Sequence, residues 1–174
     1  TQPNATTANG LPGDPDLDGL IPGFTTFDAT ILEFDVTSNC NFLSIEYIFA
    51  SEEYLEYGCS NYNDVFGFFL EGPMIDGVTP PTGQSTIVKN IAVIPGTTVP
   101  IAVNTVNSGQ PANNSTCQAA NPNYMAHSAY FNSSNGSITT LDGYTDKLTA
   151  KAYVQCGSWY TIRLKLCNVS DNWL

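Results

Sequence analysis

The sequence predicts an all-β fold, an antiparallel β-sandwich of jelly-roll type with long loops. Two observations predict it: apolar and polar residues alternate with a period of two in several segments, and turns rich in Gly, Pro and Asn separate these segments. No segment of adequate length has the i, i+3, i+4 spacing of an amphipathic helix. The 174 residues, 42% of them hydrophobic, suffice for one core, so we expect a single domain over residues 1–174.

Each strand is expected where the chain alternates, is β-branched, or is continuously apolar between turn signals. Residues 1–27 are rich in Pro, Gly, Asn and Asp and are expected to form a loop or extended segment. Asn107–Asn135 is rich in Asn, Ser and Ala and is expected to be a long, elaborated loop. The expected strands are Ile31–Val36, Phe42–Ala50, Val65–Leu70, Thr86–Ile94, Val99–Val106, Gly136–Leu141, Thr149–Cys156 and Trp159–Cys167.

The charge is strongly negative and unevenly distributed. The formal net charge is -11, and residues 1–88 hold thirteen acidic residues but no Lys or Arg, the first base being Lys89. A chain without clustered bases excludes nucleic acid and disfavours an anionic membrane surface as partners. No window approaches the roughly 20 consecutive apolar residues that insertion into a membrane requires. We therefore expect divalent ions, Ca²⁺ first among them, to balance the acids of residues 1–88.

One candidate calcium loop is the D-x-D-x-D-G run formed by Asp14, Asp16 and Asp18. Alternating carboxylates followed by Gly are able to wrap one Ca²⁺. An EF-hand is excluded because its twelfth position is Thr25 rather than a bidentate acid. The alternative is a solvated acidic turn.

A second acidic group comprises Glu52, Glu53 and Glu56, followed by Asn63-Asp64. Glu52 and Glu53 point to opposite faces in an extended chain, so we expect Glu53 and Asp64 as metal ligands or as a hydrogen-bonded brace, with Glu52 beside them. The alternative is that these acids cap loops through backbone hydrogen bonds. A carboxylate pair facing a cleft in a glycoside hydrolase is a weaker alternative.

Aromatic residues are dense, and three tyrosines fall in one predicted loop. Tyr54, Tyr57 and Tyr62 are candidates for a platform that contacts sugar or peptide. The alternative is that they pack against their own loop.

Five cysteines and a secreted-type composition predict disulfide bonds with one thiol left over. One arrangement pairs Cys40 with Cys59 and Cys117 with Cys156. Cys167 then remains, on the outward face of its strand with Arg163 and Lys165, as a free thiol or an interchain bond. The spacing does not select among fifteen possible connectivities, which stay open.

Four blocks of the chain, in order, resemble one known family. YIFASEEYLEYGCSNYNDVFGFFLEG at Tyr47–Gly72, NIAVIPGTTVPIAVNTVN at Asn90–Asn107, LDGYTDKLTA at Leu141–Ala150 and WYTIRLKLCNVSD at Trp159–Asp171 resemble the choice-of-anchor L domain of bacterial surface and secreted proteins. From the first block to the last, the resemblance spans 125 residues, Tyr47–Asp171. It departs at Asn168, where the family usually has Asp, and at Cys167, where the family usually has Ala, so it gives Asn168 no role as a metal ligand.

The resemblance implies an extracellular location, on or released from a bacterial surface, and implies no catalytic activity. Relative to the family pattern, strands are expected to be missing at both ends of the chain. We therefore expect a non-catalytic, calcium-stabilised surface module for adhesion or assembly, which binds a surface glycan, a peptide or a neighbouring subunit. One alternative is a polymerising filament or fibre subunit, a homopolymer completed by a strand from a neighbouring chain. A second is a carbohydrate-binding module or a glycoside hydrolase.

Overall fold

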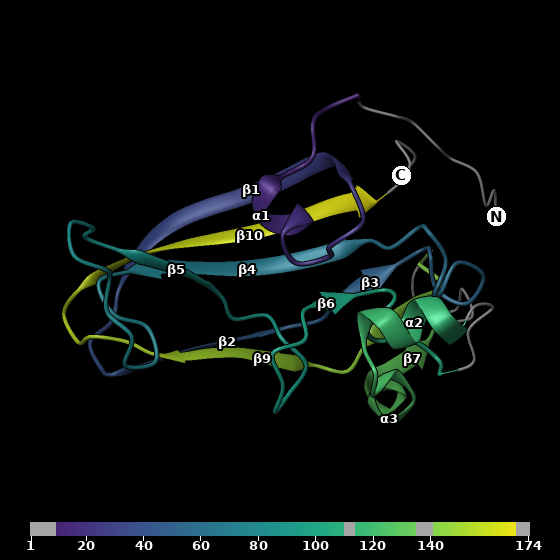
Figure 1. Cartoon of the computed structure of the whole chain (residues 1–174). Coiled ribbons are helices and arrows are strands. Elements are labelled where there is room, and N and C mark those ends of the chain that lie inside the picture. Colours follow the sequence, from purple (N-terminus) through teal and green to yellow (C-terminus); the bar gives the residue numbers. More distant parts are fainter. Residues whose placement is uncertain (1–9, 110–113, 135–140, 170–174) are drawn as a thin grey trace.

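Antiparallel β-sheets make up most of the structure, a computed structural model that describes residues 10–109, 114–134 and 141–169 (Figure 1). The largest sheet has the strand order β1-β10-β4-β5, and β6 also pairs with β4. A two-stranded sheet, β2 with β9, lies across the hydrophobic core from it. The predicted β-sandwich is confirmed. The strands of these two sheets are β1 (Thr26–Thr37), β2 (Phe42–Tyr47), β4 (Val65–Gly72), β5 (Ile87–Asn90), β6 (Ile101–Ala102), β9 (Leu148–Tyr153) and β10 (Trp159–Val169).

A third, small sheet and several short helices lie together at one end of the sandwich, on the right in Figure 1. The sheet has the order β3-β8-β7, and a further short helix, α1, lies against the largest sheet. No helix among the described residues is long and apolar enough to cross a membrane. These elements are α1 (Pro15–Asp18), β3 (Ala50–Ser51), α2 (Asn114–Ala120), α3 (Tyr124–His127), the 3₁₀ helix η1 (Ser128–Tyr130), β7 (Phe131–Ser133) and β8 (Gly143–Thr145).

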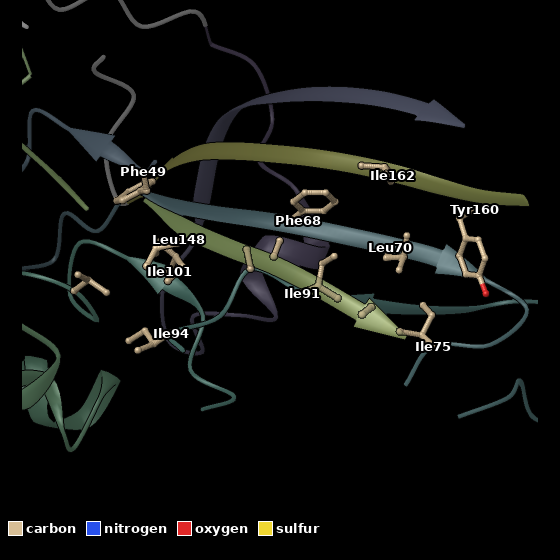
Figure 2. Close-up of a cluster of buried hydrophobic side chains, with 14 of the residues drawn as sticks. Phe49, Phe68, Leu70, Ile75, Ile91, Ile94, Ile101, Leu148, Tyr160 and Ile162 are labelled. Carbon is tan, nitrogen blue, oxygen red and sulfur yellow. The ribbon is translucent and has the colours of Figure 1, made fainter. Parts of the chain in front are cut away.

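The main core fills the space between the two larger sheets (Figure 2). In β9 every second residue is buried, which places Leu148, Ala150 and Ala152 in the core. Phe68 and Leu70 of β4 meet them from the opposite sheet. Burial of these apolar side chains, which contributes about 25 cal/mol per Å² of apolar surface removed from water, is the main force that holds the two sheets together.

β4 is also buried on its second face, as its continuous apolar sequence predicts. Val65 and Phe69 pack on that side with Leu17 of α1 in a second cluster. Gly67 makes this close approach possible, because a Cβ at this position would lie 2.8 Å from Leu17. α1 thus covers the part of the outer face around Val65 and Phe69.

Several expected boundaries were wrong. The segment 1–27 is not all loop: Asp14 caps α1 by accepting from the backbone N–H groups of Asp16 and Leu17, and β1 already begins at Thr26. Asn107–Asn135 contains helices of seven residues or fewer, too short for a helical period to emerge in the sequence. Of Val99–Val106 and Thr86–Ile94, only β6 and β5 form strands, and residues 136–140 of another expected strand lie outside the described residues.

Tyr160 of β10 joins three parts of the fold through its buried hydroxyl group. The hydroxyl donates a hydrogen bond to Met74 O (2.6 Å) and accepts one from the backbone N–H of Gln155 (2.7 Å). Tyr160→Phe should lower the free energy of unfolding by about 1–3 kcal/mol, because it leaves two backbone groups without their partner. Urea denaturation measures this effect, with Tyr153→Phe, at an exposed tyrosine, as the control. Equal stability of both variants would contradict the role given to the hydroxyl.

Candidate functional site

The acidic loop before β1 holds an ammonium group. Lys165 Nζ lies 2.7 Å from Asp14 Oδ2 and 2.6 Å from Asp16 Oδ2, and the side chains of Lys165 and Asp14 are 6% and 8% exposed. Asp18 instead accepts hydrogen bonds from the backbone N–H and hydroxyl of Thr26. Burial disfavours the charged lysine, but the two carboxylates outweigh it and raise the pKa of Lys165.

Basic residues of the C-terminal half therefore balance part of the acidic N-terminal half. β10 lies between β1 and β4, so Arg163 forms ion pairs with Glu33 of β1 and Glu71 of β4. The expectation that these acids depend on divalent ions was wrong for the pairs made by Lys165 and Arg163. That expectation considered only bases near the acids in the sequence, whereas an antiparallel sheet brings segments that are remote in sequence into contact. The sequence signal was present: the period of two places Arg163 and Lys165 on one face of their strand.

The segment after β3 contains the other predicted ligands. Ser51 Oγ donates to Asp64 Oδ2 (2.7 Å) and accepts from the backbone N–H of Glu53 (2.9 Å), so one hydroxyl links the two acidic positions. Glu53 has one carboxylate oxygen buried, whereas Glu52 is exposed and lies apart from this link. Within the described ranges, no group of three or more His, Cys, Asp or Glu residues is arranged to hold a metal ion. A calcium ion here would therefore have two carboxylates at most, with hydroxyl, carbonyl or water oxygens completing its shell.

The three candidate tyrosines separate into two environments. Tyr54 is fully buried and packs on Phe49 and Phe131, with ring centroids 6.2 and 4.8 Å away, so its predicted role in surface binding was wrong. Burial first, and then the charge of Asp64, raise the pKa of Tyr54 well above its usual range. Tyr57 and Tyr62 form an edge-to-face pair, centroids 5.1 Å apart, and Tyr57 is 46% exposed. Their contact with sugar or peptide stays a prediction.

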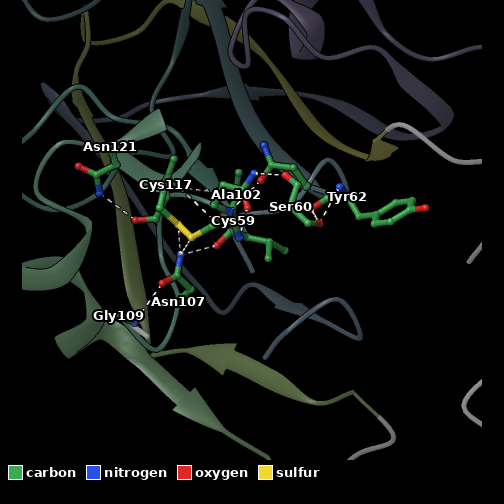
Figure 3. The surroundings of a disulfide bond; sticks show 12 residues. Cys59, Ser60, Tyr62, Ala102, Asn107, Gly109, Cys117 and Asn121 are labelled. Atoms are coloured by element: carbon green, nitrogen blue, oxygen red, sulfur yellow. Dashed lines mark hydrogen bonds between the residues drawn. A yellow bond between two sulfur atoms is a disulfide. The ribbon is translucent and has the colours of Figure 1, made fainter. Parts of the chain in front are cut away.

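Cys59 is disulfide-bonded to Cys117 of α2, with Cα atoms 4.8 Å apart (Figure 3). The pairings of Cys40 with Cys59 and of Cys117 with Cys156 were therefore wrong. Asn107 stabilises the bond region, since its side-chain amide donates to Cys117 Sγ (3.1 Å) and to Val103 O (3.1 Å). The disulfide joins the loop after β3 to the helical end of the sandwich.

Cys167 does not face solvent, so the expected interchain bond was wrong. It is 2% exposed and packs in the second apolar cluster with Leu17 and Val169. The outward face of β10 is covered here by the chain around α1, which the strand pattern alone does not reveal. Burial raises the pKa of the Cys167 thiol to about 11, which leaves little reactive thiolate at neutral pH.

One long side of the sandwich is open. β1 pairs with β10, and beyond the short pairing of Leu11–Pro12 with Phe27–Ala29, no described residue pairs with its other edge. On the core-facing side, Leu32 is 58%, Phe34 38% and Leu166 of β10 42% exposed. The reason is that β2 and β9 form too narrow a sheet to cover β1. The resulting groove is lined by Thr30, Leu32, Ile48, Phe49, Ala50, Phe66, Leu164, Lys165 and Leu166.

A disulfide bond of this kind is typical of proteins in oxidising, extracellular compartments. The model of the choice-of-anchor L domain family matches residues 1–174, and the chain belongs to this family. Comparisons with curated proteins and with solved structures gave no match. Membership makes the chain a domain of a bacterial surface or secreted protein.

Breaking the buried ion pair at Lys165 should cost far more stability than breaking an exposed one. Lys165→Met leaves the buried carboxylate of Asp14 without its cation, and we expect the free energy of unfolding to fall by about 3–5 kcal/mol. Lys147→Met is the matched control, because Lys147 pairs with Glu46 where both side chains are more than half exposed, and its loss should change stability by about 1 kcal/mol or less.

Chemical denaturation of the two variants and the parent protein measures the difference. Similar losses in both variants would show that the Lys165 pair is no stronger than a surface contact.

Proposed function

We propose that the chain is a non-catalytic assembly module of the bacterial surface, in which neighbouring copies associate along β1. The observation that carries the proposal is the open side of the sandwich. There the backbone groups on the outer edge of β1, which no strand of the described ranges pairs with, lie beside the exposed apolar residues Leu32 and Phe34. An edge strand of this kind is a template for strand addition from another chain.

The outer face of the same strand is less suited to this role. Its residues Glu33 and Asp35 make polar contacts to Arg163 and Thr161 of β10. Apolar surface exposed on the inner side therefore supplies the binding energy, at about 25 cal/mol per Å² buried, while the edge supplies backbone hydrogen bonds. The net charge of -11 opposes association of identical copies, so salt or divalent ions should favour assembly.

Self-association is expected to depend on the inner face of β1. Leu32→Lys places a charge in the apolar groove and should abolish the concentration-dependent association of the parent protein. Ile31→Lys is the matched control, because Ile31 is 48% exposed but points to the other face of the same strand, and this variant should still associate.

Sedimentation velocity over a range of protein and salt concentrations measures this association. A parent protein that stays monomeric at high concentration and high salt contradicts the proposal. Equal loss of association in both variants would point to charge alone rather than to the groove.

Calcium remains part of the proposal, at Glu53 and Asp64. The hydrogen bonds of Ser51 to both positions support it, because they already draw the two acidic segments together. The acidic loop of Asp14 and Asp16 is a poorer candidate, since the ammonium group of Lys165 would repel a second cation.

Ca²⁺ in hundredfold excess over its Kd should stabilise the fold by about 2.7 kcal/mol, a rise in melting temperature of about 5–10 °C. Thermal melts with Ca²⁺ and with a chelator measure the shift. Asp64→Asn should remove the shift, whereas Glu52→Gln, at an exposed position outside the Ser51 link, should keep it. Identical melting curves with ion and with chelator would rule out this calcium site.

A further inference from the structure

Two cysteines remote in sequence lie on neighbouring connections of the fold. Cys40 belongs to the connection between β1 and β2, and Cys156 to the connection between β9 and β10. Since β1 pairs with β10 and β2 with β9, both connections cross from the large sheet to the small one at the same end of the sandwich. This is the end on the left of Figure 1, away from the helices.

Two backbone hydrogen bonds fix how these connections run past each other. Val154 N donates to Asn41 O (3.0 Å), and Gly157 N donates to Ser38 O (2.7 Å). The two bonds continue the register of β2 with β9, in which Phe42 faces Tyr153. Cys40 and Cys156 both lie between these bonds, one on each segment and displaced by a single residue.

This placement suits a disulfide bond. Paired antiparallel residues have Cα atoms about 4.5–5.5 Å apart, and a displacement of one residue brings the separation to about 6 Å. Disulfide bonds span Cα separations of about 4.4–6.8 Å. In a straight ladder, a displacement of one residue would point the side chains of Cys40 and Cys156 to opposite faces. Neither segment is a straight strand here, because the chain bends at Asn39–Asn41 and Gly157 has a φ of +77°.

The two thiols are also accessible to oxidation. Both are exposed, whereas Cys167 is buried. In its reduced form the Cys40 thiol donates to Phe42 O (3.2 Å), a contact at the surface that rotation of the side chain releases. The domain already contains the Cys59–Cys117 bond, and its family is one of surface and secreted proteins, where disulfides form and persist.

We propose that Cys40 and Cys156 form a second disulfide bond that joins the β1–β2 and β9–β10 connections, with Cys167 as the single remaining thiol. The Sγ–Sγ bond forms as the two thiols lose two protons and two electrons. The oxidant is the disulfide of a thiol–disulfide oxidoreductase or of oxidised glutathione, which is reduced to two thiols. With the Cys59–Cys117 bond already formed, the path from Cys40 to Cys156 runs through the stretches 40–59 and 117–156, so the new bond would close a loop of about 60 residues in the unfolded chain and restrict that state further.

Peptide mapping of the full chain tests the proposal without any substitution. The protein is exported to an oxidising compartment, unfolded without reductant, alkylated, and digested with trypsin and a Glu-specific protease. Cleavage after Glu46, Glu52 or Glu53 separates Cys40 from Cys59, and cleavage after Lys147 or Lys151 separates Cys117 from Cys156. We expect alkylation at Cys167 alone and a linked peptide pair containing Cys40 and Cys156. Alkylation of Cys40 and Cys156, or linkage of either to another cysteine or another chain, overturns the proposal.

Thermal melting of three variants gives an independent measurement. Cys40→Ser, Cys156→Ser and the double variant should each lose the same 5–15 °C or so, since removing either partner removes the whole bond. Losses that add up in the double variant, or variants that melt with the parent protein, show that the two cysteines act separately and contradict the bond.

Discussion

The buried contact of Lys165 with Asp14 and Asp16 determines how the two ends of the chain meet. Lys165 lies near the end of β10, and its ammonium group reaches the loop that begins α1. With this pair formed, Leu17 covers the outer face of β4, and Cys167 and Val169 become buried beside it. A buried pair of this kind contributes little net energy when intact but is costly to break on one side only. It therefore specifies one position for the N-terminal segment, and the apolar contacts of Leu17 supply the stabilisation.

The same strand explains why one side of the sandwich remains open. β10 presents Tyr160 and Ile162 to the core, where β9 covers them, but the opposite sheet does not extend over β1. On the outer face, α1 covers the region around Leu17 and the ion pairs of Arg163 and Lys165 lie beside it, although Ile31 stays exposed there; on the inner side of the edge strand, Leu32 and Phe34 are exposed together. Uncovered apolar area beside free backbone groups is a property of surfaces that bind other chains.

The sequence predicts the regular parts of the fold and fails where remote segments meet. β4, β9 and β10 follow directly from their apolar periods, because a half-buried or fully buried strand leaves that signal in the residues themselves. The partner of Lys165 leaves no local signal, because it is more than a hundred residues away and is set by sheet order. The burial of Tyr54 likewise depends on Phe49 and on Phe131 from a different strand, and the partner of Cys59 on where α2 packs. Resemblance to the family identifies the class of protein, but these contacts come only from the structure.

The two ends of the sandwich bear on the proposed function in one further way. The Cys59–Cys117 bond holds the helical end, and the proposed Cys40–Cys156 bond would hold the opposite end, where both sheets are connected. With both bonds formed, the sandwich would resist separation of its sheets, so the groove along β1 would keep its shape before the proposed partner arrives. Binding would then cost less conformational entropy, since neither sheet would have to reorganise when a strand is added. Covalent bonds far from the groove would in this way raise the affinity of an edge that makes no contact with them.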